Sequence, residues 1–205
     1  MDLKDLEGGI SKAIRESTKE VFSTMLMMEV KAEESFVKDE KNVSTDLISS
    51  LHFFGDKYMG KIAIFSSGGA ACHIANAMLG TETTVVNEEI KDGMGELVNM
   101  IAGLAKVKLT DILGDINLLT PWVIAGSHVT IASPENTGGE LALDSQAGFS
   151  WIMTNVEFEK GTFMVGVQPN AVPENNKVSS VSAKEVESLK EEIKELKDEI
   201  ERLKS

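Results

Sequence analysis

The sequence predicts an α/β fold of the α+β type, in which long helices pack on a largely antiparallel sheet and a C-terminal coiled-coil helix follows. Two observations predict the globular part. Segments with helical spacing of apolar residues are interspersed with β-branched and aromatic runs typical of strands, and short turn-prone stretches separate consecutive strands, as in hairpins. The third observation, a regular heptad near the C terminus, predicts the coiled coil.

The first half of the chain predicts three helices and a hairpin. Apolar residues at helical spacing indicate a helix over 10–28, and strands follow over 46–55 and 58–67, divided by the turn-like "GDK". A second helix over 67–80 ends at Gly80, a C-cap residue. Asn87 is a suitable N-cap for a third helix that runs to about Leu109, because its side chain can accept from a free backbone amide.

The second half predicts strands over 116–126, 140–146, 149–159 and 162–168, separated by Gly, Pro and Asn. The composition changes at Pro169, after which Pro, Asn and Ser are frequent and few residues suit a core. We therefore expect a domain over 1–168, a linker over 169–183 and a coiled-coil tail over 184–205.

The tail has valine or isoleucine at every a position and leucine at every d position, a choice that favours two parallel strands. Glutamates at g face lysines at e in such a dimer, whereas an antiparallel pair would oppose like charges. The sequence leaves open whether this helix pairs with itself or with another protein, and whether it is native or appended. The a and d residues are Val186, Leu189, Ile193, Leu196, Ile200 and Leu203.

The composition excludes several classes of function. The chain of 205 residues has a formal net charge of −13, and an acidic surface repels nucleic acids and anionic membranes. Cys72 is the single cysteine, so an intrachain disulfide is impossible. No apolar run approaches the ~18 residues that span a bilayer. These features predict a cytoplasmic protein without nucleic-acid or membrane partners.

The third helix carries a polar stripe that a structural helix does not need. At about 100° per residue, Asp92, Glu96 and Asn99 point the same way. The apolar residues of this helix cluster on the opposite side: Ile90, Met94, Leu97, Ile101 and Leu104. One face is therefore suited to a core and the other to a ligand or partner. The simpler interpretation of such polar residues is a solvated surface.

The spacing of Asp92, Glu96 and Asn99, followed by Pro121 after 21 intervening residues, resembles the signature of the CheC/CheX/FliY family of chemotaxis phosphatases. The resemblance covers residues 1 to about 168 and implies a CheC-like fold. CheC and FliY generally carry two such helices. Here the earlier helix offers only a degenerate echo, with Gly69, His73 and Asn76 at the signature spacing. One intact motif and no FliY-type C-terminal domain make CheX the nearest match.

The resemblance implies a phosphatase that hydrolyses the aspartyl phosphate of a CheY-like response regulator, with Glu96 and Asn99 as catalytic residues. By this resemblance, Asn99 orients the attacking water and Glu96 binds a lysine of the regulator. Asp92 and Gly103 belong to the partner-binding face, although the role of Asp92 stays open because it also suits the helix start. Pro121 shapes its loop.

The resemblance further implies a homodimer and no cofactor of the protein's own, with Mg²⁺ carried by the phosphorylated partner. The dispersed histidines offer no spacing for a metal site. Two alternatives remain at this stage: a non-catalytic adaptor or flagellar-switch scaffold assembled through the coiled coil, and a phosphatase serving a two-component pathway other than chemotaxis. The sequence does not identify the regulator.

Overall fold

The structure, a computed structural model, describes residues 3–38, 42–132 and 151–172. Residues 1–171 form one compact unit. The final strand runs to Ala171, so residues 169–171, predicted as the start of the linker, belong to the sheet instead. The remainder of the predicted linker, the coiled coil and the strand predicted over 140–146 lie outside the described residues.

Within the described residues eight strands form one sheet, and every strand pairing in it is antiparallel. The strand order is β1-β7-β8-β4-β3-β5, while β2 also pairs with β7 and β6 also pairs with β3. The predicted class of fold is thus confirmed. The strands are β1 Lys31–Ala32, β2 Phe36–Lys38, β3 Asn42–Gly55, β4 Tyr58–Ser66, β5 Ile116–Leu118, β6 Trp122–Ala132, β7 Trp151–Phe158 and β8 Gly161–Ala171.

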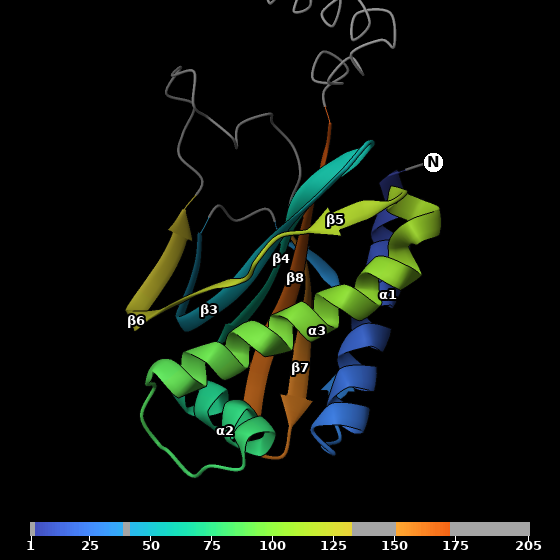
Figure 1. Cartoon of the computed structure of the whole chain (residues 1–205). Helices are drawn as coiled ribbons and strands as arrows, with labels where there is room; N and C mark the ends of the chain where they lie inside the picture. The colour runs from blue at the N-terminus through green and yellow to red at the C-terminus, as the bar shows by residue number, and fades with distance from the viewer. Residues whose placement is uncertain (1–2, 39–41, 133–150, 173–205) are drawn as a thin grey trace, which may run out of the picture. The chain divides into compact units, whose positions relative to one another are not determined.

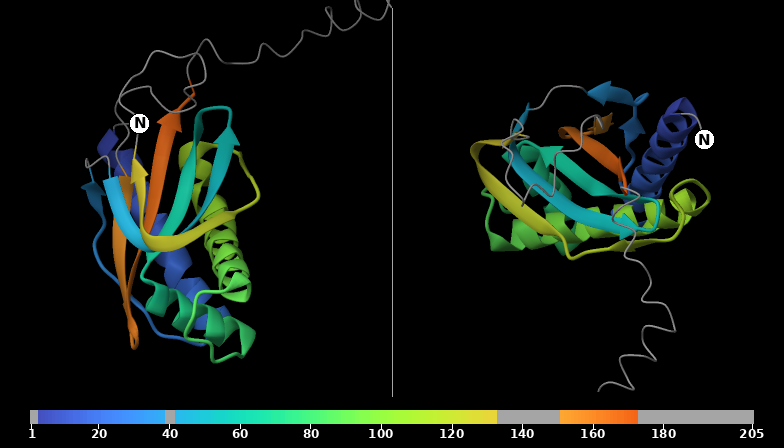
Figure 2. Two further views of the ribbon diagram at one scale, coloured as in Figure 1. Left: turned by 90° about the vertical axis from the view of Figure 1, so that its left-hand side faces the viewer. Right: turned by 90° about the horizontal axis from the view of Figure 1, so that it is seen from above.

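Three helices, α1 Leu3–Met25, α2 Gly68–Leu79 and α3 Glu88–Leu113, pack on one face of this sheet (Figures 1 and 2). Their ends follow the local signals in the sequence. Gly80 closes α2 in the left-handed conformation with φ 68°. The Asn87 side chain accepts a hydrogen bond of 3.0 Å from the Ile90 amide at the start of α3. None of the described helices is long and apolar enough to cross a membrane.

The hydrophobic core lies between the helices and the sheet, and a smaller cluster occupies the other face of the sheet. Successive residues of β3 point to opposite faces, so Leu47 joins the main core and Ile48 the smaller cluster. In that cluster the rings of Phe65 and Trp151 meet edge to face at 5.4 Å. The central strands are buried on both faces, which explains their nearly continuous apolar sequence.

Close contacts on three sides position the middle of α3. The buried hydroxyl of Ser49 on β3 donates a hydrogen bond of 2.8 Å to the Met94 carbonyl. A Cβ at Gly93 would lie 3.1 Å from the Cβ of Ala75 on α2, and one at Gly95 would lie 3.5 Å from Val123 on β6. Gly93 therefore permits a close approach of α2 that a larger residue would hinder, whereas a Cβ at Gly95 would be in ordinary contact with β6.

The structure also differs from the sequence-based expectation at element boundaries and in the short strands. The first helix begins at Leu3 rather than at residue 10, and α3 continues to Leu113. The strand predicted over 116–126 is interrupted, because β5 and β6 pair with different parts of β3. The short strands β1 and β2 were not predicted, since two or three residues are too few to show an alternating pattern.

We predict that Gly93→Val lowers the free energy of unfolding by about 1–3 kcal/mol, because the new side chain must displace α2. Gly103→Val on the same helix is the matched control, since a Cβ there has no heavy atom within 4 Å. Urea denaturation followed by circular dichroism measures both. Equal stability of the two variants would contradict the close approach of α2 and α3.

Candidate functional site

The polar stripe is exposed on α3 and has no partner within the protein's described residues. Asp92, Glu96 and Asn99 are all exposed, and none makes a hydrogen bond or ion pair with another described residue. On the opposite side Ile90, Met94, Leu97 and Ile101 are fully buried, while Leu104 is half-buried. The helix is therefore held by its apolar face, and the polar groups contribute no visible packing.

Pro121 lies close to the stripe although 21 residues separate it from Asn99. A Cβ at Gly95, the neighbour of Glu96, would come within 4.0 Å of the Pro121 Cγ. Pro121 falls between β5 and β6, where its missing amide costs no strand hydrogen bond. This proline thus fits a role in shaping the chain beside the stripe. No local pattern in the sequence indicated Gly95 or Ser49, because their roles depend on contacts across the fold.

Gly103 continues the exposed side of α3 about one turn beyond Asn99. Its surroundings are open, and a Cβ there would meet no heavy atom within 4 Å. The glycine is therefore not required by packing inside the chain. Glycine in a helix interior is less favourable than alanine by about 1 kcal/mol, so the position is unexplained by the folded chain alone.

The charge on α3 is concentrated in its N-terminal half. Glu88, Glu89, Asp92 and Glu96 lie there, and Lys91 pairs with Glu88 at 2.7 Å. Three carboxylates have no ion pair with another described residue, Glu89, Asp92 and Glu96, and the last two share their side of the helix with the neutral amide of Asn99. Carboxylates suit a cationic partner group, whereas an amide can both donate and accept a hydrogen bond with water. In the described part of the chain no three His, Cys, Asp or Glu side chains cluster to hold a metal.

The imperfect copy of the motif on α2, formed by Gly69, His73 and Asn76, has a structural role. The Asn76 amide nitrogen donates a 2.8 Å hydrogen bond to the Thr83 carbonyl, and its oxygen accepts bonds from the Thr81 hydroxyl and the Thr83 amide. Asn76 thereby fastens the loop that joins α2 to α3. His73 is exposed beside it. The side chain that matches Asn99 in the motif is thus fully engaged within the protein.

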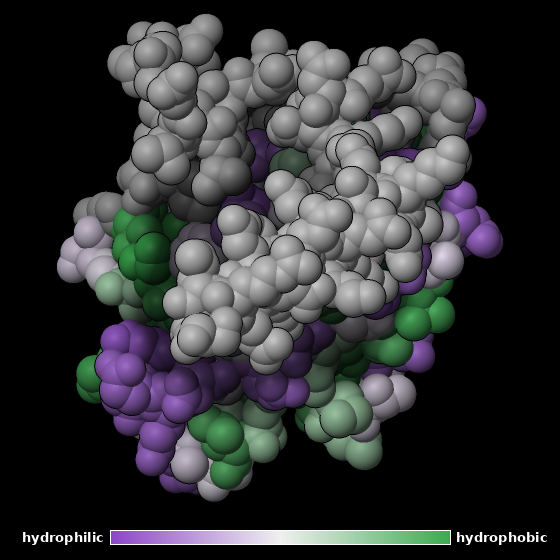
Figure 3. Space-filling view, turned by 45° about the horizontal axis from the view of Figure 1, so that its top comes forward, coloured by the Kyte–Doolittle hydropathy of each residue, from purple (hydrophilic) through white to green (hydrophobic). Residues whose placement is uncertain are grey.

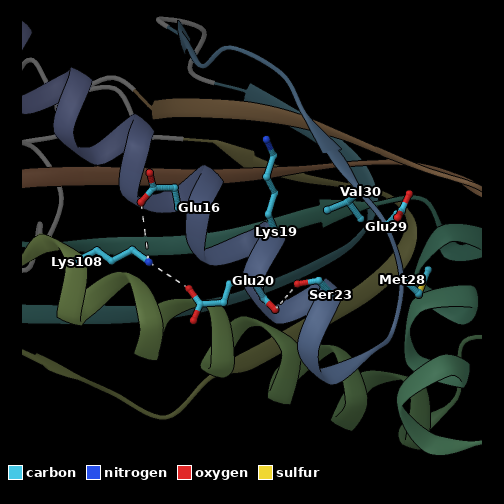
Figure 4. A pocket seen from close by; sticks show the side chains of 8 residues that line it. All are labelled: Glu16, Lys19, Glu20, Ser23, Met28, Glu29, Val30 and Lys108. Atoms are coloured by element: carbon cyan, nitrogen blue, oxygen red, sulfur yellow. Dashed lines mark hydrogen bonds and ion pairs between the residues drawn. The ribbon is translucent and has the colours of Figure 1, made fainter.

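Two hollows near the helices do not present a set of polar groups comparable to the stripe on α3. One, of about 600 Å³, lies between α1, the following segment and α3 (Figure 4), and its Lys108 is paired with Glu20 at 3.1 Å and Glu16 at 3.9 Å. The other lies beside α2 and includes Cys72. Burial raises the pKa of this thiol, so it stays protonated at neutral pH and is a poor nucleophile.

The coloured part of the surface in Figure 3 shows small hydrophilic and hydrophobic areas side by side, without a broad apolar area among the described residues visible there. A large hydrophobic patch is the usual mark of a permanent interface.

The comparisons with known proteins agree with these observations. Residues 47–141 match the family described as "Chemotaxis phosphatase CheX", a range that contains Asp92, Glu96, Asn99, Gly103 and Pro121. The resemblance predicted from the sequence is thereby confirmed. No curated protein matches the chain in sequence.

Solved structures share the fold. A chemotaxis protein CheX from Desulfovibrio desulfuricans is 24% identical, with a TM-score of 0.65, covering 80% of this chain and 99% of its own. The CheX of the Borrelia burgdorferi CheX–CheY–BeF3–Mg²⁺ complex is similar at 18% identity and a TM-score of 0.58, covering 78% of this chain and 96% of its own. Thermotoga maritima FliY is similar at 16% and 0.53, covering 80% and 90% respectively.

The two asparagines at matching motif positions should behave oppositely in stability measurements. We predict that Asn76→Ala lowers the free energy of unfolding by about 1–3 kcal/mol, because three hydrogen bonds are lost and their partners are left unsatisfied. Asn99→Ala should change it by less than about 0.5 kcal/mol, as expected for an exposed residue without partners. Thermal denaturation of both variants tests this, and a large loss in Asn99→Ala would assign that residue to the fold.

Proposed function

We propose that this chain is a phosphatase that hydrolyses the aspartyl phosphate of a CheY-like response regulator, with Glu96 and Asn99 as its catalytic residues. One observation carries the proposal: Asp92, Glu96 and Asn99 are exposed and have no partner among the described residues, on a helix whose other side is buried in the core, with Pro121 beside them. The match to the CheX family of phosphatases supports it. The Borrelia burgdorferi relative has been seen in complex with CheY.

Asn99 is proposed to position the water that attacks the phosphorus. Hydrolysis of an acyl phosphate needs a water in line with the leaving carboxylate, and correct placement of the nucleophile is the main requirement for phosphoryl transfer. The amide is neutral, so it can approach the anionic phosphoryl group without repulsion. It is also a poor competing nucleophile. The packed helix holds the backbone of Asn99 in place, so only the rotamers of its side chain remain to be selected by the partner.

Glu96 is proposed to bind a lysine of the regulator. It precedes Asn99 by three residues, so both side chains lie on one side of the helix about 4.5 Å apart along its axis. A carboxylate beside a phosphoryl group is repelled by it, and therefore a nearby ammonium group is the favourable partner. Asp92 lies one turn earlier and adds negative charge to this partner-binding face.

Mg²⁺ is expected on the regulator and not on this protein. The described residues provide no cluster of ligands for the ion, whereas the Borrelia burgdorferi complex contains Mg²⁺ together with CheY and BeF3. We therefore expect the phosphatase to have no cofactor of its own. The metal would instead neutralise charge on the phosphoryl oxygens of its substrate.

We predict different kinetic losses for the two central residues. Asn99→Ala should reduce kcat by a factor of about 100 or more while leaving regulator binding nearly unchanged, because it removes only the group that positions water. Glu96→Ala should also weaken binding, by about 2 kcal/mol or more, because the partner lysine loses its counter-charge. The measurements are decay of the phosphorylated regulator and titration with a regulator bearing a phosphoryl mimic.

Asp111→Ala is the matched control, since it removes an exposed acid from the same helix far from the stripe. It should keep the kinetics of the unsubstituted protein. If Asn99→Ala retained full turnover, the phosphatase proposal would be wrong. Stoichiometric binding of the phosphorylated regulator without any turnover would instead support the non-catalytic adaptor.

We further propose a homodimer to which the C-terminal heptads contribute. Since β8 extends to Ala171, truncation after Val172 is expected to leave the sheet intact. The shortened protein should keep turnover per molecule but dissociate at concentrations at least about tenfold higher, because linked contacts reinforce each other. Analytical ultracentrifugation of both proteins over a dilution series tests this. Monomers at every concentration in both samples would refute it.

A further inference from the structure

We infer that the docking face for the regulator extends along α3 beyond Gly103 to Val107, whose exposed side chain anchors an apolar side chain of the partner. This inference rests on the proposed function, because it concerns the same helix and the same partner. It adds an apolar contact to a face described so far only by its charges, its amide and its glycine.

Val107 is exposed where the rest of the apolar residues of α3 are not. Its exposed fraction is 73%, and it is the one large hydrophobic residue of this fully described helix that is classed as exposed. On the helical wheel it lies about 20° from Glu96 and about 40° from Gly103. Val107 therefore continues the side of the helix that carries the stripe.

The residue types at 103 and 107 do not suit a solvated helix surface. Glycine and valine both have lower helix propensity than alanine, lysine or glutamate, which normally occupy exposed positions. Neither residue is required by packing, since Gly103 has open space around it and Val107 is mostly exposed. Two such residues, four positions apart and next to Asn99, are explained together if a partner covers them.

The geometry places these residues within reach of one partner domain. With a rise of 1.5 Å per residue, Val107 lies about 12 Å from Asn99 along the axis, and the stretch from Asp92 to Val107 spans about 22 Å. A surface of this length matches one side of a standard interface of about 800 Å² per partner. The charges would bind at one end, the glycine would admit the partner's backbone, and the valine would anchor the other end.

A neighbouring segment runs alongside the face. The chain returns beside α3 from Asp115, which pairs with Lys106 at 3.9 Å, to Pro121 near Gly95. The two ends of the face differ, because Asp92 and Glu96 lie at one end and Val107 at the other. This asymmetry favours one orientation of the regulator, with its phosphoryl group over Asn99.

A second copy of this chain fits the face less well. If two such faces met about a twofold axis near Gly103, the carboxylates of each would face the apolar end of the other and would lose water without gaining a counter-charge. A parallel arrangement would oppose acid to acid. A regulator with a cationic group and an apolar side chain avoids both costs.

The test uses Val107→Ala and Gly103→Ala in the full-length protein. Alanine removes the anchor at 107, and at 103 it fills the space reserved for the partner. We expect each change to raise KM for the phosphorylated regulator about fivefold with kcat unchanged. Melting temperatures should stay equal or rise, because alanine favours the helix in both cases.

The matched controls are Met25→Ala, which removes an apolar side chain with 62% exposure from α1, and Gly8→Ala, which fills an equally open position on the same helix. Both should keep the KM of the unsubstituted protein. A rise in KM for the controls equal to that of the test variants would overturn the inference, as would an unchanged KM for Val107→Ala while Asn99→Ala still abolishes turnover.

Binding of a regulator loaded with beryllofluoride separates this inference from the proposed function. If the unsubstituted protein binds it without turning over the phosphorylated form, the proposed activity is wrong, and weaker binding by Val107→Ala would still support the anchor. If Val107→Ala instead shifts the sedimentation of the protein alone, the face is a contact between copies, and the inference is overturned.

Discussion

The packing of α3 against the sheet is the constraint on which the proposed site depends. Ile90, Met94, Leu97 and Ile101 are fully buried on one side of it, and the Ser49 hydroxyl donates a hydrogen bond to the Met94 carbonyl within the core. Gly93 allows α2 to approach closely. Because these contacts hold the helix through its buried face, Asp92, Glu96 and Asn99 on the exposed face are not needed to keep it in place.

This division suits a reaction in which positioning is the main contribution of the protein. A regulator that brings its own metal ion and lysine needs from its phosphatase a correctly oriented water and a firm grip. An amide and a carboxylate on a packed helix have their backbone positions fixed before a partner binds, so only their side-chain rotamers remain to be ordered. A site with only these two groups is therefore compatible with phosphatase activity.

The comparison of α2 with α3 shows how one side-chain type can serve two purposes. Asn76 and Asn99 occupy corresponding positions in their helices. The Asn76 side chain makes three hydrogen bonds to the loop after α2, whereas the Asn99 side chain makes none with any described residue. The fold shared with relatives at 16–24% identity does not by itself establish an activity. The candidate site on α3 differs from the imperfect motif on α2 because its polar groups are available at the surface.

Features that depend on neighbouring residues could be predicted without the structure. The β3–β4 hairpin, the caps Asn87 and Gly80, and the polar and apolar sides of α3 were all predicted, because turn chemistry, capping and helical periodicity act over a few residues. The four-residue spacing that ends at Pro121 indicated the family, although spacing alone did not place the proline in space.

Features that depend on residues far apart in the chain could be seen only in the folded structure. The contact of Pro121 with Gly95, the bond of Ser49 to α3, and the break between β5 and β6 each arise where segments meet across the fold. Exposure of Val107 is likewise a result of packing, since Ala105 and Leu109, two residues to either side of it, are the ones that the core buries. Local propensities carry no information about such long-range contacts, because these contacts depend on how the whole core is buried.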